Sequence, residues 1–384
     1  MLCNMKIGTN SIILAVLMVG CFSCDRNDSH QKSAGLYDFV VLDENNSVGE
    51  RTIKLSELVD DYEVVKFENS DSALFKVRKP VVSENYIAVI QGGMDPVVLF
   101  DRKGNYIGNI GNVGSGPGEY MTAYDALIDE ANGRIYITQM VNGQVLEYDL
   151  EGKYQGTHQI GSLNKPTLFA NGDESISLVN IAFDDAGVPL TAATFGNASD
   201  SVVRLIYQPL VTSFRDASGA GVGFNNEVWA FRNTPNNAFM LTFNDTLYTY
   251  NSRENVIAPR AVFKELSDKS SDTWYVGLEF PTAIIYQVMG SDSRTMWYDK
   301  SSAELSRATI INDFCGNAKE SVSNFRDGYY VHIWEPGRLM DRIEERWLPE
   351  NEMTDQQRED LKELFSELNP DDNNIMFIGK MKNI

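Results

Sequence analysis

Histidine and cysteine are scarce in this sequence of 384 residues, which contains three histidines and four cysteines. The histidines, His30, His158 and His332, are far apart and lack the spacing of a zinc site. Beyond residue 24 the only cysteine is Cys315, so the sequence contains no disulfide framework. Its neighbours in the chain supply no base that would activate a catalytic thiol. We therefore expect no metal site and no cofactor, and we expect Cys315 to be a buried structural residue.

Basic residues are outnumbered, because 33 lysines and arginines stand against 54 aspartates and glutamates, and the formal net charge is −21. Nucleic-acid binding depends on clustered lysine and arginine, so this charge argues against that class of protein. The apolar run from Ile12 to Val19 is too short to span a membrane as a helix. Hydrophobic residues still make up 43% of the chain, which is enough for a packed core.

The N-terminus has the pattern of a secretory signal, with Lys6, a short apolar run and a small residue before Cys21. The segment Met18–Cys21 resembles a bacterial lipobox, in which the cysteine after the cut is acylated. The resemblance implies removal of residues 1–20 and lipid attachment at Cys21, with Cys24 as the alternative acceptor. A plain secretory peptide with a chance cysteine is the other interpretation.

Acylation would attach the chain to a membrane through lipid chains and not through a spanning helix. The polar residues 21–50 would then form a flexible tether, and residues 51–384 would form one folded body. These features predict a lipid-anchored protein of the cell envelope, at the outer membrane. They leave open its face, periplasmic or surface, and its oligomeric state.

A sequence pattern recurs after 48 residues. Tyr86–Ile90 matches Arg134–Thr138, and Phe100–Gly108 matches Tyr148–Gly156. The longer pair shares the form aromatic-Asp-x-x-Gly-x-Tyr-x-Gly. Weaker echoes occur at Leu247–Asn251 and Met296–Lys300. Short strand-like runs separated by turn residues, at a period near 48, are typical of the four-stranded blades of a β-propeller.

The sequence therefore predicts an all-β fold, a six-bladed β-propeller of four-stranded blades over residues 51–384. The final strand, Ile375–Met381, is expected to pair with Tyr62–Phe67 and close the ring, which removes exposed sheet edges.

One C-terminal helix is expected as an insertion in the last blade. Thr354 begins a capping box, and four apolar residues then follow at helical spacing. They are Leu361, Leu364, Phe365 and Leu368. We expect this face to pack on the propeller; docking of a partner is the alternative.

A glycine-rich stretch contains Gly114, Gly116, Pro117 and Gly118. Pro117 followed by Gly118 fits the two central positions of a type II turn. The stretch does not have the sequence of a P-loop or of a dinucleotide fingerprint, and Pro117 lacks an N–H for an anion. We interpret it as a structural corner between two sheets.

The chain resembles the six-bladed β-propeller lipoproteins of Bacteroidota, which are distantly similar to NHL-repeat propellers. The likeness covers most of residues 50–384. Besides the lipobox, it is carried by Leu55–Val59, Phe100-Asp101 with Gly104, Gly114–Tyr120 and Gly379–Lys382. The resemblance implies a fold and a location but supplies no activity.

For function we expect a non-catalytic binding or scaffold module whose glycan, peptide or protein ligand enters the propeller funnel. Tryptophan rings could stack on sugar faces there, although core packing is their commoner role. The five are Trp229, Trp274, Trp297, Trp334 and Trp347. A partner in a larger envelope complex is a further class.

A glycan hydrolase or lyase is the alternative. The adjacent acidic pairs Asp184-Asp185, Glu344-Glu345 and Asp371-Asp372 do not supply two carboxylates converging across a bond. A binding module predicts aromatic and amide side chains in the funnel, whereas an enzyme predicts converging acids and bases. We assign no catalytic residue from the sequence.

Overall fold

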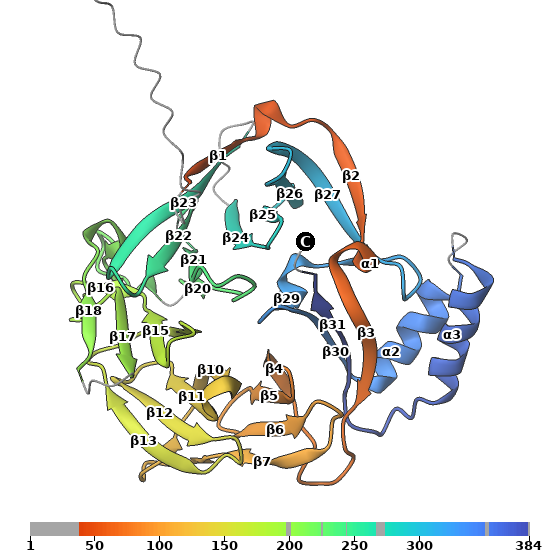
Figure 1. Cartoon of the computed structure of the whole chain (residues 1–384), viewed down its shortest axis with the longest axis horizontal. Helices are drawn as coiled ribbons and strands as arrows, with labels where there is room; N and C mark the ends of the chain where they lie inside the picture. Colours follow the sequence, from red (N-terminus) through yellow and green to blue (C-terminus); the bar gives the residue numbers. More distant parts are fainter. Residues whose placement is uncertain are drawn as a thin grey trace, which may run out of the picture. The chain divides into compact units, whose positions relative to one another are not determined.

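Six blades of four antiparallel strands are arranged around a central axis (Figure 1). The structure, a computed structural model, describes residues 38–196, 201–223, 226–242, 244–265, 273–349 and 353–382. In each blade one edge strand lies nearest the axis and the fourth strand lies at the rim. The all-β, six-bladed fold expected from the sequence is therefore confirmed.

The blades follow one another along the chain. The first three consist of β4 (Val77–Val82), β5 (Tyr86–Gln91), β6 (Val97–Asp101) and β7 (Tyr106–Ile110); β10 (Ala123–Asp129), β11 (Arg134–Gln139), β12 (Gln144–Asp149) and β13 (Tyr154–Gln159); and β14 (Thr167–Ala170), β15 (Ser175–Val179), β17 (Ala192–Gly196) and β18 (Val203–Leu205). The last three consist of β20 (Val228–Trp229), β21 (Ala238–Leu241), β22 (Thr246–Asn251) and β23 (Val256–Lys264); β24 (Trp274–Glu279), β25 (Ala283–Met289), β26 (Arg294–Asp299) and β27 (Glu304–Asn312); and β29 (Phe325–Arg326), β30 (Tyr329–Trp334), β31 (Ile375–Met381) and β3 (Val59–Lys66). The short elements are β8 (Asn112–Val113), β9 (Glu119–Tyr120), β16 (Ala182–Phe183), β19 (Val211–Thr212), β28 (Ala318–Glu320) and α1 (Leu55–Leu58).

Strand β3, near the start of the folded body, completes the sixth blade. It pairs antiparallel with β31, from Val59 opposite Met381 to Lys66 opposite Ile375. This is the ring closure expected from the sequence, and it is confirmed. Hydrogen bonds between the two ends of the propeller therefore hold the ring shut.

The segment before β3 extends two more blades. β1 (Val40–Asp43) pairs parallel with β23, and β2 (Glu50–Lys54) pairs parallel with β27. Leu42 in β1 is only 1% exposed. The tether expected over residues 21–50 is therefore too long at its C-terminal end, because β1 gains ladder hydrogen bonds and buries an apolar side chain.

The core lies between neighbouring blades. One cluster joins Ala88 and Leu99 of the first blade to Ala126 and Ile137 of the second. Since a blade packs against a neighbour on each face, the middle strands are apolar on both sides; the interior of β5 is fully buried. Face-to-face packing of sheets in this way builds a continuous core.

The repeated aspartate ends the third strand of its blade and shapes the next turn. Asp101 Oδ1 accepts hydrogen bonds of 2.9 Å from the N–H groups of Lys103 and Asn105. The equivalents that end β12, β22 and β26 and accept from the following turn are Asp149, Asn251 and Asp299. The weak sequence echoes near residues 251 and 299 are therefore structurally equivalent positions.

The glycine-rich corner connects the first blade to the second. Pro117 and Gly118 form the turn between β8 and β9, which pair in parallel. The N–H of Gly116 donates to the Glu119 carboxylate at 2.8 Å, and Gly114 also lies against that carboxylate. The chain's own carboxylate thus takes the place that a bound anion would need.

The corner depends on the absence of a side chain at Gly118, which has φ +73°. A Cβ there would lie 2.5 Å from the ring of Tyr154, whereas Gly172, at φ +74°, has nothing within 4 Å. We expect Gly172→Ala to lower the free energy of unfolding by about 1–2 kcal/mol. Gly118→Ala should cost about 1–3 kcal/mol more, because the ring must move. Equal losses in chemical denaturation of the two variants would contradict this role of the corner.

The helical insertion lies between β30 and β31. It contains α2 (Pro336–Arg342), a π-helix over Ile343–Trp347 and α3 (Asp355–Ser366). Thr354 and Gln357 form the expected capping box at the start of α3, and the apolar face of α3 packs on the core of the last two blades. Helix α2 was not expected, because it is short and begins at a proline. Within the described residues, no helix is both long and apolar enough to cross a membrane.

Candidate functional site

Two cavities lie at the axis, one at each end of the inner strands. The first, of about 310 Å³, lies where β4, β10, β14, β20 and β29 begin. We call it the axial cavity; its lining includes Arg78, Lys79, Tyr124, Trp229, Phe231 and Arg326. The second, of about 470 Å³, lies where these strands end and includes Thr234. We call it the opposite cavity.

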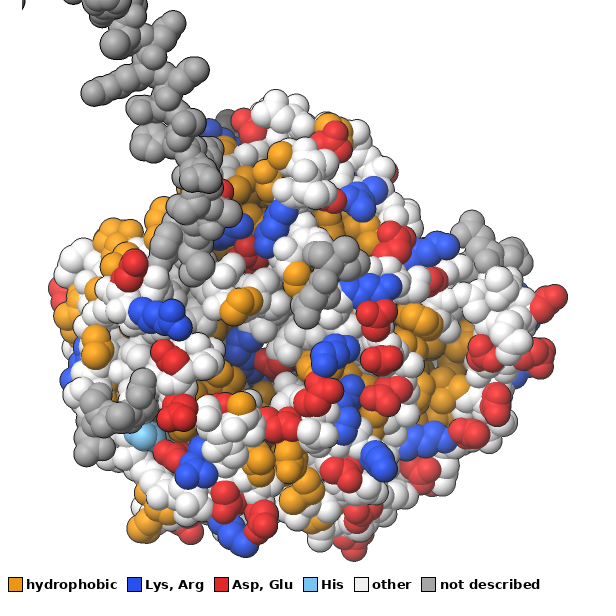
Figure 2. Space-filling model, viewed as in Figure 1, with side chains coloured by type: hydrophobic (Ala, Val, Ile, Leu, Met, Phe, Trp, Pro, Cys, Tyr) orange, Lys and Arg blue, Asp and Glu red, His pale blue; other side chains and the backbone are white. Residues whose placement is uncertain are grey.

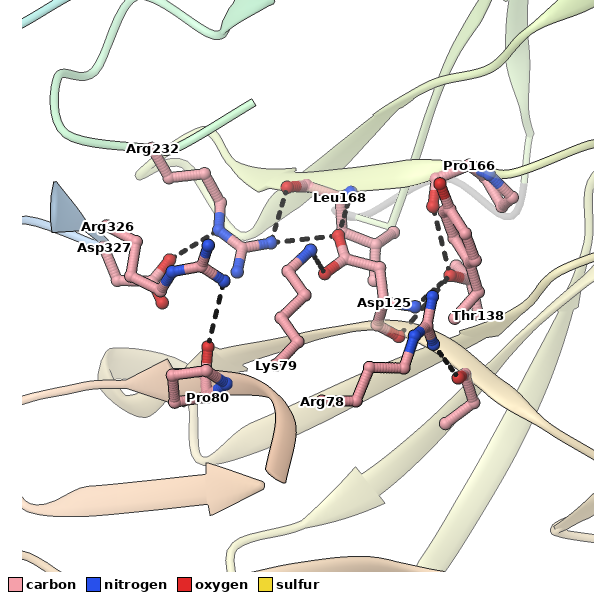
Figure 3. Close-up of polar contacts among 12 residues, drawn as sticks. Arg78, Lys79, Pro80, Asp125, Thr138, Pro166, Leu168, Arg232, Arg326 and Asp327 are labelled. Carbon is pink, nitrogen blue, oxygen red and sulfur yellow. Dashed lines mark hydrogen bonds and ion pairs between the residues drawn. The ribbon is translucent and has the colours of Figure 1, made fainter. Parts of the chain in front are cut away.

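Charged side chains cross the axis between the two cavities (Figure 3). Arg232 contacts Asp125 through Nη1 at 3.0 Å and Asp327 through Nε at 2.6 Å. Lys79 Nζ lies 2.6 Å from the other oxygen of Asp125. The Asp125, Asp327 and Arg232 side chains are only 0%, 7% and 8% exposed. We call these four residues the axial ion cluster; it joins the first, second, fourth and sixth blades.

Backbone groups complete the surroundings of both carboxylates. The N–H of Leu168 donates to Asp125 at 2.9 Å, and the N–H of Val82 donates to Asp327 at 3.1 Å. Buried charges are tolerated when they are paired and hydrogen-bonded. Each carboxylate of the cluster therefore has both a cation and a backbone donor.

The loop after β20 places Arg232 at the axis. Arg232 has φ +57°, a conformation that costs a non-glycine residue about 1–2 kcal/mol. Next to it, Asn233 donates to the carbonyl of Phe325 at 2.9 Å and accepts from the N–H of Gly328 at 3.2 Å. Bonds to the sixth blade thus hold the loop in this conformation.

Asp125 is ionised at neutral pH. Burial acts to raise the pKa of its carboxyl, but the charges of Arg232 and Lys79 outweigh burial and hold the pKa below its usual value. A general acid needs a proton near the working pH, so Asp125 is a fixed negative charge and not a proton donor.

Two arginines of the axial cavity contact neutral groups. Arg326 Nη1 lies 3.5 Å from the carbonyl of Pro80, and its guanidinium lies 6.0 Å from the Phe231 ring centre. Arg78 donates to the carbonyl of Ala123 at 3.0 Å and lies over Tyr124 at 5.2 Å. Among the described residues, no carboxylate lies within ion-pair distance of either arginine.

Glu227 is the carboxylate at the wall of the axial cavity. It accepts a hydrogen bond of 2.6 Å from Lys165 Nζ and another from the Tyr124 hydroxyl. Burial and the neighbouring Glu227 raise the pKa of Tyr124. Tyr124 therefore stays protonated as a donor to Glu227 and does not act as a base.

The family model of the domain of unknown function DUF4934 matches residues 39–380. The chain belongs to this family. No curated protein matches the chain in sequence. The match begins just before β1 and ends within β31, one residue before its last, so the axial cavity lies inside the family domain.

Solved structures resemble this DUF4934 chain in fold. A Bacteroides fragilis protein described as exported has 15% identity and a TM-score of 0.58, with 90% of this chain and 100% of that chain covered. A member of the DUF4221 family from Bacteroides vulgatus has 11% identity and a TM-score of 0.45, with 85% and 98% covered. At 15% identity the likeness to the Bacteroides fragilis protein shows the fold alone.

Only one of the five tryptophans lines the axial cavity. Trp229 does so while stacking on Trp274 at 5.7 Å. Trp297 and Trp347 are buried in the core, and Trp334 stacks on His332 at 4.4 Å. The fold therefore does not place several tryptophans at the axis where a sugar could stack on them.

The other residues noted in the sequence lie away from the axial cavity. His332 lies 3.2 Å from Glu320, and His158 lies 2.8 Å from Glu147. Cys315 is buried, which raises its thiol pKa to about 12. Within the described ranges, no group of three histidine, cysteine or acidic side chains is placed to hold a metal. The proposed lipidation sites Cys21 and Cys24, and also His30, lie outside the described residues.

The axial ion cluster was missed by the sequence reasoning. Two signals point to it in retrospect: Asp125 lies among apolar residues inside a strand that otherwise has only Asp129, at its end, as an acidic residue, and a Phe-Arg pair follows or ends the inner strand of two blades. These pairs are Phe231-Arg232 and Phe325-Arg326. Neither signal says which charges meet.

Proposed function

We propose that this chain is a non-catalytic binding module of the cell envelope and that its ligand enters the axial cavity. The observation that carries the proposal is the convergence of five blades on one cavity lined by aromatic and hydrogen-bonding side chains. Small-molecule sites combine an apolar wall with a few placed polar groups. Tyr124, Trp229 and Phe231 supply the wall here, and arginine and lysine supply the polar groups.

The charges at the axis favour binding over hydrolysis. Glycosidases need one protonated and one ionised carboxyl across a bond. Among the described residues near the axial cavity, Asp125 and Asp327 are held by Arg232, and Glu227 is held by Lys165. Each carboxylate is thus engaged by a cation, and Asp125 is kept ionised.

The location in this proposal rests on the N-terminal sequence. The signal pattern and the lipobox-like Met18–Cys21 support export, removal of residues 1–20 and acylation of Cys21, with Cys24 as the alternative. The similar Bacteroides fragilis protein is described as exported. We propose that the lipid anchors the protein in the outer membrane. Mass spectrometry of the mature protein would test the acylation itself by the mass of its first residue.

A binding screen with product analysis tests the function. Glycan and peptide libraries are offered to the chain from residue 37 onward, and every bound ligand is recovered for mass spectrometry. Ser323→Trp is designed to fill the axial cavity, and Thr234→Trp to fill the opposite cavity. We expect saturable binding of an intact ligand, lost in Ser323→Trp and kept in Thr234→Trp.

Two results would contradict the proposal. Recovery of a cleaved ligand would show that the protein is an enzyme. Binding that survives Ser323→Trp but not Thr234→Trp would place the ligand at the opposite cavity. Circular dichroism of both variants checks that each is folded.

A further inference from the structure

We infer that the ligand of the axial cavity is an anion and that its negatively charged group lies against Arg78, Lys79 and Arg326. This inference rests on the proposed function, because it names the chemistry of the ligand at the same cavity. The group recognised is an oxyanion, such as a carboxylate or a sulfate.

The balance of charge at the axis is the first argument. Among the described residues in and below the axial cavity, five carry a positive charge and three a negative charge. The cations are Arg78, Lys79, Lys165, Arg232 and Arg326, and the carboxylates are Asp125, Glu227 and Asp327. The whole chain has a formal net charge of −21, and acidic and basic side chains are interspersed over the face in Figure 2. A local excess of cations at the axis is therefore opposite in sign to the protein as a whole.

The second argument is which of the cations already lie beside a carboxylate of the protein. Arg232 lies between two carboxylates, and Lys165 lies on Glu227. The excess therefore belongs to Arg78 and Arg326, whose hydrogen bonds within the described structure go to backbone carbonyls. Both side chains line the cavity, and aromatic rings lie under both guanidinium groups. A guanidinium held in this way offers its remaining N–H groups to a carboxylate or sulfate, which it binds in a planar fork.

Burial disfavours the charged forms of Lys79 and Arg326 unless an anion lies beside them. Burial lowers the pKa of Lys79, and the charges of Arg232 and Arg326 add to this effect against the attraction of Asp125. Burial likewise lowers the pKa of Arg326. A negative ligand group would reduce this repulsion, since an opposite charge favours the charged form of a cation.

The floor of the cavity limits how the ligand enters. The axial ion cluster lies between the axial cavity and the opposite cavity, and the side chains of Asp125, Arg232 and Asp327 in it are almost fully buried. About 310 Å³ is room for roughly ten water molecules. The ligand therefore enters by one end or one side group and does not thread along the axis.

Calorimetry with matched anionic and neutral probes tests the inference. The anionic probes are a galacturonic acid disaccharide, a glutamate-containing peptide amide and inorganic sulfate. The neutral probes are the methyl ester of the disaccharide and the peptide with glutamine. We expect at least one anionic probe to bind, more weakly at high salt, and its neutral counterpart to bind about tenfold or more weakly. Comparison of the three anions separates a sugar, a peptide and a bare oxyanion as the source of the charge.

Arg326→Gln provides the variant, and Arg51→Gln its matched control. Arg51 also lies over an aromatic ring, 5.8 Å from that of Trp297, but it lines a cavity away from the axis. We expect Arg326→Gln to lose about tenfold in anion affinity and to melt, without ligand, no lower than the unaltered protein. Arg51→Gln should keep the affinity. Arg78→Gln, at an exposed position, repeats the test if Arg326→Gln does not fold.

The outcomes separate the inference from the proposed function. Equal binding of anionic and neutral probes, abolished by Ser323→Trp, would overturn the inference and leave the axial binding site standing. A lower melting temperature of ligand-free Arg326→Gln, or no binding by any of the three anions at millimolar concentration, would also overturn it. Anion binding that Ser323→Trp leaves intact would overturn both.

Discussion

Val65→Asp is expected to abolish cooperative folding, or to lower the free energy of unfolding by more than about 4 kcal/mol. Val65 lies in β3, the strand that closes the ring, and is 4% exposed. It packs in the cluster between the sixth and first blades. A carboxylate there would be buried without a partner, which is among the most destabilising changes in a protein. Among the described strands, β3 pairs only with β31. Loss of the packing at Val65 should therefore free β3 and open the ring.

Val64→Asp is the matched control for this prediction. Val64 is the next residue of the same strand, but its side chain points to the opposite face and is 39% exposed. The same substitution should cost about 1 kcal/mol there, mainly through the low strand propensity of aspartate. Urea denaturation followed by tryptophan fluorescence measures both variants. Similar losses at the two positions would mean that the closure is not what stabilises the fold.

Arg232→Met is the second change with a large expected effect, a loss of about 3–5 kcal/mol in the free energy of unfolding. The substitution removes a cation that contacts both Asp125 and Asp327. Asp125 keeps Lys79, but among the described residues Asp327 is left with the N–H of Val82 as the donor to its carboxylate. Methionine is as poorly suited as arginine to the positive φ at this position. The loss in the free energy of unfolding therefore comes from the missing charge and not from backbone strain.

Arg134→Met tests whether burial causes this effect. Arg134 pairs with Glu147 at 2.7 Å, a similar distance, but its side chain is 41% exposed. Pairs near the surface contribute about 0–1 kcal/mol, so Arg134→Met should lower the free energy of unfolding by no more than that.

Adding Asp327→Asn to Arg232→Met should recover part of the stability, because the uncompensated carboxylate is then gone. No recovery in the double variant would contradict the assignment of the loss to Asp327.

These two predictions concern different parts of the same ring. The β3–β31 pairing closes it at the rim, while the axial ion cluster joins four blades at the centre. The cluster also forms the floor beneath Arg78 and Arg326. Stability of the propeller and the charge of its proposed ligand site are therefore linked through Arg232 and its two carboxylates.

Features that depend on residues close together in the chain could be predicted before the fold was known. The aspartate that ends the third strand and folds the next turn is one such feature, since Asp101 and Asn105 are only a few residues apart. The capping box of Thr354 and the apolar face of α3 are others. The ring closure joins distant parts of the chain, but it was predicted because a propeller ring without it would leave sheet edges exposed.

The candidate site could not be predicted in the same way, because its residues come together only in the folded ring. Asp125, Arg232 and Asp327 lie in different blades, with Arg232 separated by 107 residues from Asp125 and by 95 from Asp327. No spacing in the chain encodes their meeting, because it results from six blades closing around one axis. The sequence does show an acidic protein in which acidic residues outnumber basic ones. That several of those cations gather at the axis, two of them with only neutral partners among the described residues, follows from the geometry of the ring.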